Sequence, residues 1–410
     1  MPETPPPGAE PLDPVPAPRV LLAGGGTAGH VNPLLATAAA LREPALGGRE
    51  EAGILVLGTA EGLEAGLVPE AGFDMAVVPR VPMPRRPTGD LFMLPRRLSR
   101  AVGAAGEAIE AVDAQVVVGF GGYVSTPAYL AARRAGVPVV IHEQNARPGL
   151  ANRLGASWAA AVALTFASTP LRSSKGRTEV TGLPLRPAIG ELVARMAEPD
   201  GAAAARRSGA AALGLDPQAP TVLITGGSLG AQRLNEVLAA ALPSLSPDLQ
   251  VLHLTGRDKD GPVRAAVEAA VADGAAADLA ERYHVLDYLV AMEQAYACAD
   301  GVICRSGAGT VAELTALGLP ALYVPLPIGN GEQRLNAADV VAAGGGRLVA
   351  DARLTAADVV DFTALLTRPA ERGAMAAAAA STGVRDGARR LADLIRTVAR
   401  EGCPSPRRKA

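Results

Sequence analysis

A histidine follows a glycine-rich turn near the start of the sequence, and its type and position suit acid–base chemistry. The stretch VLLAGGGTAGHVNPLLA covers residues 20–36; Gly24, Gly26 and Gly29 fit the spacing G-x-G-x-x-G, and His30 comes directly after them. An imidazole has an unperturbed pKa near neutrality, so it can take up a proton at physiological pH. Glycine turns of this spacing also occur in dinucleotide-binding proteins, which makes an oxidoreductase one alternative.

The next expected strand argues against a nicotinamide site. Such a site usually has an Asp or Glu at the end of the second strand, where it holds the ribose hydroxyls. Here the strand GILVLGT at residues 53–59 ends in Leu57, Gly58 and Thr59, and no acid stands there. A nicotinamide cofactor also needs no histidine in the first turn of the following helix. The oxidoreductase therefore remains only an alternative.

Composition narrows the class of protein. A chain of 410 residues predicts two domains of similar size. The net charge of −2 gives no global attraction to nucleic acid, and we expect no nucleic-acid partner. The three cysteines, Cys298, Cys304 and Cys403, form no C-x-x-C pair, which argues against a disulfide framework and a structural zinc site. No apolar run reaches the ~20 residues of a membrane span.

The chain alternates short β-branched strands with alanine-rich helices, a pattern typical of parallel sheets covered on both faces. Segments with this pattern lie at residues 19–25, 53–59, 114–122, 137–145, 221–242, 249–256, 283–289, 301–314 and 320–327. The pattern restarts with a second glycine turn after an Ala/Arg-rich connector near 190–212. We therefore predict an α/β protein of two Rossmann-like, doubly wound domains that face each other across a cleft, with ligands at the carboxyl ends of the strands.

The domain boundaries follow from this restart. We expect a disordered, proline-rich leader over 1–18 rather than a signal peptide. The two domains are expected over 19–187 and 213–385, and a C-terminal helix over 386–401 that packs back on the first domain.

Two motifs of the second half suit nucleotide binding. GGSLGA at residues 226–231 exposes backbone N–H groups at a helix start, where an anion binds well, and Ser228 adds a hydroxyl donor. The alternative is a tight turn with Ser228 as a plain helix cap. In RSGAGTVAEL, Thr310 and Glu313 have nearly the spacing of a capping box, so a purely structural role is the alternative there.

Seven motifs follow one another along the chain: GGGTAGHVNP, GFGGYVSTPAYLAA, HEQNARPGLANR, TGLPLRP, GGSLGAQRLNE, RSGAGTVAE and GNGEQRLNA. In order and spacing they resemble the MurG family of N-acetylglucosaminyltransferases. The resemblance covers about residues 19–345. It implies the GT-B fold, UDP-N-acetylglucosamine as donor and the lipid-linked N-acetylmuramoyl-pentapeptide called lipid I as acceptor. It also implies an inverting transfer to the 4-hydroxyl that forms lipid II for peptidoglycan, without a cofactor.

The resemblance also implies roles for individual residues. The residues expected to bind the UDP-sugar are Thr27, Ala28, Gly29, Asn145, Arg186, Ser228, Leu289, Ala308, Gly309, Thr310, Val311, Glu313 and Gln333. Among them, Glu313 would accept hydrogen bonds from the ribose and Gln333, with Glu332, would reach the transferred sugar. An inverting displacement needs a base, for which we expect His30, with Glu143 in reserve. We find no Asp-x-Asp near a strand end and expect no metal.

A basic and apolar segment predicts a membrane contact. In PMPRRPTGDLFMLPRRLSR at residues 82–100, Leu91 and Phe92 stand near Arg96 and Arg97. Such a segment can enter the headgroup region of an anionic bilayer, which a lipid-linked acceptor requires. We therefore expect a peripheral protein at the cytoplasmic face of the cell membrane. The alternative is a buried turn surrounded by solvated arginines.

Two further classes share part of this pattern. Another GT-B enzyme that uses UDP-N-acetylglucosamine, such as a 2-epimerase or an antibiotic glycosyltransferase, would share the nucleotide-binding half. It should lack GFGGYVSTP and HEQN, both of which are present here. The dinucleotide-dependent oxidoreductase is the more distant alternative.

Overall fold

The N-terminal half forms a parallel sheet of seven strands in the computed structural model, which describes residues 17–81, 90–227, 232–274, 278–328 and 330–402. Its strands are β1 (Arg19–Ala23), β2 (Gly53–Gly58), β3 (Asp74–Val77), β4 (Val116–Gly119), β5 (Val139–Glu143), β6 (Ala161–Leu164) and β7 (Arg177–Val180). They lie in the order β3-β2-β1-β4-β5-β6-β7. The helices of this half are α1 (Ala28–Arg42), α2 (Glu64–Glu70), α3 (Asp90–Ala111), α4 (Gly122–Ala135) and α5 (Leu150–Gly155), with a 3-10 turn at Pro44–Leu46.

The C-terminal half repeats this plan with six parallel strands in the order β10-β9-β8-β11-β12-β13. Its strands are β8 (Thr221–Thr225), β9 (Gln250–Leu254), β10 (Tyr283–Leu286), β11 (Gly301–Cys304), β12 (Ala321–Tyr323) and β13 (Gly346–Leu348). Its helices are α8 (Gln232–Ala241), α9 (Gly261–Ala272), α10 (Leu279–Arg282), α11 (Met292–Cys298), α12 (Ala308–Leu317), α13 (Glu332–Asn336), α14 (Ala338–Ala342), α15 (Ala356–Leu366) and α16 (Pro369–Thr382). Two 3-10 turns lie at Leu242–Ser244 and Asp351–Arg353.

The central strands form because most of their residues are β-branched or aliphatic and are buried on both faces. Val116–Gly119 and Gln250–Leu254 are buried at every position. Both sheets reverse their strand order at the first strand, since β1 lies between β2 and β4 and β8 lies between β9 and β11. In open α/β sheets this switch point is where ligands bind. The turns after β1, β4, β8 and β11 are therefore the places to look for a site.

The connector near 190–212 is helical and belongs to the C-terminal half. It forms α6 (Pro187–Met196) and α7 (Gly201–Leu213), and α7 packs against α11. Residues such as Leu192 and Ala205 join the core of the second sheet. Alanine-rich sequence at this point therefore continues the helical layer of the second domain.

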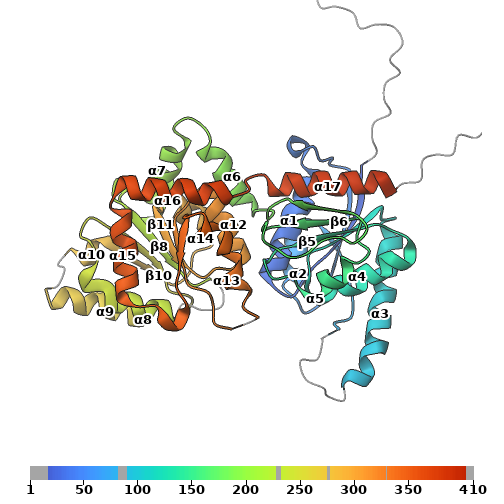
Figure 1. Cartoon of the computed structure of the whole chain (residues 1–410), viewed down its shortest axis with the longest axis horizontal. Coiled ribbons are helices and arrows are strands. Elements are labelled where there is room, and N and C mark those ends of the chain that lie inside the picture. The colour runs from blue at the N-terminus through green and yellow to red at the C-terminus, as the bar shows by residue number, and fades with distance from the viewer. Residues whose placement is uncertain (1–16, 82–89, 228–231, 275–277, 329, 403–410) are drawn as a thin grey trace, which may run out of the picture.

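The last helix, α17 (Gly387–Gly402), returns to the N-terminal domain. α16 runs along the C-terminal domain and α17 continues along the N-terminal one, as the red helices of Figure 1 show. Leu391, Ile395 and Val398 are buried in the same cluster as Leu34 on α1. The chain thus crosses between its two domains a second time, after the first crossing near residue 186.

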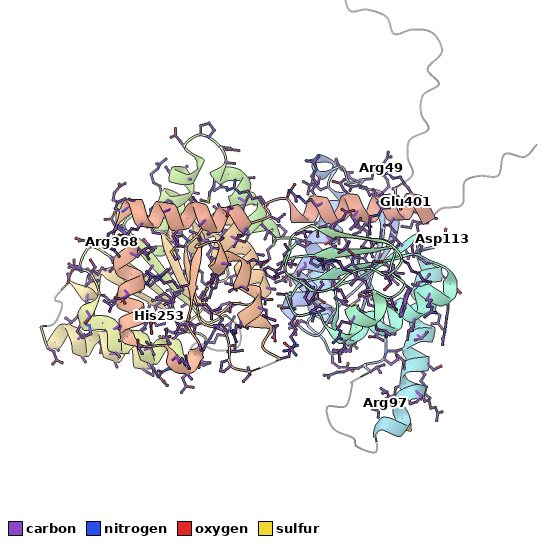
Figure 2. The ribbon with its side chains drawn as sticks, viewed as in Figure 1. Arg49, Arg97, Asp113, His253, Arg368 and Glu401 are labelled. Carbon is purple, nitrogen blue, oxygen red and sulfur yellow. The ribbon has the colours of Figure 1, made fainter. Side chains whose placement is uncertain are left out.

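A buried histidine links three elements of the C-terminal domain. The Nδ1 atom of His253 on β9 is 2.8 Å from the Tyr283 hydroxyl, and its Nε2 atom is 3.0 Å from Oδ1 of Asn235 on α8. His253 is fully buried and lies inside the domain in Figure 2. Burial lowers its pKa to about 3.

This pKa predicts a pH-dependent stability. Between about pH 6 and pH 4 the unfolded chain binds a proton at His253 that the folded protein does not. As the pH is lowered through this range, the free energy of unfolding should therefore fall by about 1.4 kcal/mol per pH unit. Urea unfolding of His253→Gln should lack this part of the decline, whereas His284→Gln, at a half-buried position, should keep it. If His253→Gln declines as steeply as the parent, His253 is protonated in the folded state.

Candidate active site

Two glycine turns meet at the switch point of the N-terminal sheet. The N–H of Phe120 donates to the carbonyl of Ala23 at 2.8 Å, and the hydroxyl of Ser125 donates to the same carbonyl at 3.0 Å. A Cβ atom on Gly122 would lie 2.8 Å from the carbonyl oxygen of Gly25, so only glycine lets the two turns approach this closely. The turns after β1 and β4 therefore form one rigid unit.

His30 lies against this unit. It is the third residue of α1, and its Nδ1 atom is 2.9 Å from the hydroxyl of Thr27. A Cβ atom on Gly121 would stand 3.3 Å from His30 Nε2, and the φ of +91° at Gly121 disfavours any side chain there. Burial lowers the pKa of His30, and a hydrogen bond with the Gly25 backbone and the charge of Glu64 partly oppose this. The imidazole is therefore neutral at physiological pH and able to accept a proton.

Glu143, the reserve candidate for the base, holds a loop together. It ends β5 and is 3% exposed. Its carboxylate accepts hydrogen bonds from the backbone N–H groups of Asn145 and Gly149, both at 3.0 Å, and from Nδ2 of Asn152 at 2.9 Å. Burial raises its pKa although these hydrogen bonds oppose the rise. These contacts give Glu143 a loop-shaping role.

The loop that Glu143 shapes contacts the other domain. Asn336 on α13 accepts a hydrogen bond from the N–H of Ala146 at 2.9 Å and donates to Oδ1 of Asn145 at 3.2 Å. Its amide also donates to the carbonyl of Ser306, just after β11. Arg147 donates to the carbonyl of Asn330 nearby. Asn145, an expected sugar contact, is therefore oriented by a buried residue of the C-terminal domain that lies within the GNGEQRLNA motif.

Two expected donor-binding residues meet in an ion pair. Arg186 donates from Nε and Nη2 to the two carboxylate oxygens of Glu313, at 2.8 and 3.1 Å. The buried hydroxyl of Tyr296 on α11 donates to the same carboxylate at 3.0 Å. The capping-box alternative for Glu313 is wrong, because α12 begins at Ala308 with Gly307 as its cap, and Glu313 turns to Arg186 instead.

The start of α12 offers backbone donors. Gly307 has no side chain to cap the helix, so the N–H groups of the first turn, which holds Ala308, Gly309 and Thr310, are positioned for a ligand. Val311 follows in the same turn and is buried in the core of the domain. Asn145 follows β5 of the N-terminal domain and contacts Asn336, whereas Arg186 stands where the chain crosses between the domains and contacts Glu313.

Gln333 and Leu289 border the same region. Oε1 of Gln333 accepts a hydrogen bond from the N–H of Leu326 at 2.9 Å, and the Glu332 carboxylate accepts one from the N–H of Asn330. Both residues, on α13, therefore stabilise the loop that precedes this helix. Leu289 is partly buried against the core of the C-terminal domain. Thr27, Ala28 and Gly29 lie at the start of α1 beside His30. Ser228 lies outside the described residues.

The expected membrane residues fall on a helix. α3 spans Asp90–Ala111, so the backbone of these residues is helical and not a turn. The first turns of α3 project beyond the body of the domain, as the position of Arg97 in Figure 2 shows. Met93 is 46% exposed and Arg96 is exposed, whereas the side chains of Leu91 and Phe92 lie outside the described residues.

A pocket of about 250 Å³ adjoins the first glycine turn. Its lining residues come from the ends of the first three strands and from α4; they are Gly26, Thr59, Glu61, Gly62, Leu63, Arg80 and Tyr123. The Arg80 guanidinium stacks on the Tyr123 ring at 5.4 Å. Nowhere in the described ranges do three His, Cys, Asp or Glu residues gather as metal ligands would.

Comparisons with known proteins agree with this architecture. Family models of the glycosyltransferase family 28 N-terminal and C-terminal domains match residues 20–164 and 221–391. A relative from Bifidobacterium longum (strain DJO10A), named UDP-N-acetylglucosamine--N-acetylmuramyl-(pentapeptide) pyrophosphoryl-undecaprenol N-acetylglucosamine transferase, is 51% identical over 345 residues, which are 82% of this chain and 86% of the relative.

Solved structures point the same way. The crystal structure of Acinetobacter baumannii MurG aligns with a TM-score of 0.72 and 27% identity over 93% of this chain and 99% of that one. A calicheamicin glycosyltransferase aligns with a TM-score of 0.61 and 17% identity over 94% of this chain and 100% of that one, which shows a shared fold alone.

Fold and site together define a hexosyltransferase of the GT-B fold. The predictions of two Rossmann-like domains and of this enzyme class are confirmed. Within glycosyltransferase family 28, the chain belongs to the MurG family.

Proposed function

We propose that this enzyme transfers N-acetylglucosamine from UDP-N-acetylglucosamine to the N-acetylmuramoyl group of lipid I, which yields lipid II for peptidoglycan. The observation that carries the proposal is the 51% identity to a relative of that name, which extends over both domains. The calicheamicin glycosyltransferase, at 17% identity, shares only the fold with this chain. It therefore gives no comparable support for transfer to a natural product.

The donor would bind to the C-terminal domain. The first turn of α12 offers N–H groups to the nucleotide, and Glu313, held by Arg186 and Tyr296, offers a carboxylate to the ribose. Asn145, which contacts Asn336 of α13, and Gln333, on the same helix α13, would orient the sugar with their amides. Backbone dipoles and Arg186 would stabilise the departing diphosphate.

The acceptor would approach from the N-terminal domain. Its 4-hydroxyl oxygen attacks the anomeric carbon while the bond to the UDP oxygen breaks, and His30 takes the hydroxyl proton. A single displacement of this kind inverts the anomeric configuration. The neutral state of His30, which its burial favours, is the state that a base needs.

Transfer of labelled N-acetylglucosamine to lipid I tests the proposal directly. Product formation that requires both substrates supports it, and no transfer from this donor to lipid I refutes it. A thermal-shift comparison of UDP-N-acetylglucosamine with NAD(H) separates the oxidoreductase, since stabilisation by NAD(H) alone would favour that class.

We infer that the enzyme works at the cytoplasmic face of the cell membrane, because its proposed acceptor is lipid-linked. No helix in the described ranges has the length and hydropathy to cross a bilayer. We infer that the projecting start of α3 forms the peripheral contact, with apolar side chains in the headgroup region and Arg96 and Arg97 beside anionic lipid. Each arginine near such a surface adds about 1 kcal/mol.

The double variant Leu91→Ser with Phe92→Ser tests this contact. Sedimentation with anionic vesicles should fall and KM for lipid I should rise, because apolar insertion is lost. Donor binding and melting temperature should stay unchanged. Val180→Ser is a matched control, since Val180 is an exposed apolar residue on β7, at the other edge of the sheet. A fall of several degrees in the melting temperature of the double variant would mark Leu91 and Phe92 as core residues.

A further inference from the structure

A buried carboxylate lies beneath the glycine turn that leads to His30. Glu64 is the first residue of α2 and is fully buried. It accepts hydrogen bonds from the N–H of Gly26 at 3.0 Å and from the N–H and the hydroxyl of Thr59 at 3.0 and 2.8 Å. The carboxylate therefore joins the turn after β1 to the end of β2.

Three glycines leave room for this carboxylate. A Cβ atom would lie 2.4 Å from Glu64 Oε1 if placed on Gly25, 2.2 Å from it on Gly62, and 2.6 Å from Glu64 Cγ on Gly58. Gly25 belongs to the turn after β1, whereas Gly58 ends β2 and Gly62 belongs to the connection from β2 to α2. The space beneath the turn is thus shaped around the Glu64 side chain.

The carboxylate is ionised. Burial raises the pKa of Glu64, but the hydrogen bonds from Gly26 and Thr59 outweigh burial and leave the pKa below its ordinary value. In dinucleotide-binding folds a diphosphate approaches the N–H groups of this turn. Here Glu64 already accepts the Gly26 N–H, so its negative charge would repel a diphosphate from the turn. This arrangement argues further against the oxidoreductase.

We propose that Glu64 is a positioning residue for the catalytic base. Its carboxylate takes the place of a bound anion and fixes the turn from Gly25 to Thr27. Thr27 in turn holds His30 against the second glycine turn. The contacts run from Glu64 to Gly26 N–H, along the turn to Thr27, and from the Thr27 hydroxyl to His30 Nδ1 at 2.9 Å. This inference rests on the proposed function, because it assigns His30 as the base.

The charge of Glu64 also acts on His30 through space, since it opposes the effect of burial on the His30 pKa. Arg80 and Tyr123 line the pocket beside the same glycine turn. Glu143 accepts a hydrogen bond from Asn152, and a Cβ atom on Gly121 would stand close to both Asn152 Nδ2 and His30 Nε2. Replacing Glu64 alone leaves these groups in place, so a change in His30 titration reports on Glu64.

Glu64→Gln is the first test. With lipid I and UDP-N-acetylglucosamine, kcat should fall about 10- to 100-fold because the base is less well placed, while KM for the donor stays unchanged. NMR titration of the His30 ring, without substrate, should show its pKa lowered further, since the attraction of the carboxylate for the imidazolium is gone. Thr59→Val, which removes one hydrogen bond and keeps the charge, should leave that titration unmoved.

Gly62→Ala and Gly66→Ala form a second, matched pair. A methyl group added at Gly62 would collide with the Glu64 carboxylate and displace it. Gly66 lies on α2, the helix that Glu64 begins, and a methyl group there would meet open space. Only Gly62→Ala should lower kcat. If Glu64→Gln keeps the parental kcat and His30 titration, the positioning role is wrong. If Glu64→Gln does not fold, the same outcome in Gly62→Ala shows this. Absence of transfer by the parent enzyme would instead refute the proposed function, and the NMR titration would still test the link to His30.

Discussion

His30→Ala is expected to lower kcat by about 10²–10⁴, the usual contribution of a positioned general base. The histidine is held between the Thr27 hydroxyl and the Gly121 backbone and lies in the N-terminal domain, away from the ion pair of Arg186 and Glu313. KM for UDP-N-acetylglucosamine should therefore stay nearly unchanged, as for an interaction made only in the transition state. Transfer of labelled sugar to lipid I, followed over donor concentration, measures both constants.

The dependence of kcat/KM on pH gives a second test of His30 as the base. A base must be neutral to act, so kcat/KM should fall as the pH drops through the pKa of His30, and burial places that fall below the ordinary value of 6.5. His30→Ala should lack this acidic limb. Glu143→Gln is the comparison: its hydrogen bonds hold a loop, so we expect lower stability with the acidic limb retained. Near-normal turnover in His30→Ala would assign the base to Glu143 or another group.

The sequence is most informative where burial alone sets the structure. Runs such as Val116–Gly119 are buried on both faces, and their composition is sufficient to identify them as strands. β6 and β7 gave weaker signals, because Ala161–Leu164 is rich in alanine and Arg177–Val180 is a polar edge strand. The apolar run at 158–167 is too short to span a membrane and contains β6.

The glycine turns and His30 could be found because a local motif carries them. Glu64, Asn336 and Tyr296 could not, since their roles depend on contacts between distant parts of the chain. Glu64 is 38 residues from Gly26, and Asn336 is 191 residues from Asn145. No acid stands at the end of β2, and the acid that reaches the turn, Glu64, begins the next helix. The sequence alone does not show which distant residues a side chain contacts in the folded protein.

Glu313→Ala is expected to raise KM for UDP-N-acetylglucosamine about 10- to 150-fold, which corresponds to about 1.5–3 kcal/mol for a hydrogen bond to a charged group. A carboxylate offers about four acceptor positions. Arg186 and Tyr296 use three of them here, which leaves about one for a ribose hydroxyl. The loss of this one bond to the ribose accounts for a rise within the stated range, and kcat should change little.

Stability separates the two roles of this carboxylate. Glu313→Ala also leaves the buried Tyr296 hydroxyl without its acceptor, which should cost about 1–3 kcal/mol of unfolding free energy, although the protein still folds. Tyr296→Phe is the matched control: it removes the same hydrogen bond but keeps the carboxylate and its pair with Arg186, so donor KM should stay near the parental value. If Glu313→Ala lowers turnover while donor KM is unchanged, Glu313 does not hold the ribose. If Tyr296→Phe raises KM as much as Glu313→Ala does, the carboxylate acts through its orientation, and the hydroxyl of Tyr296 is what fixes it.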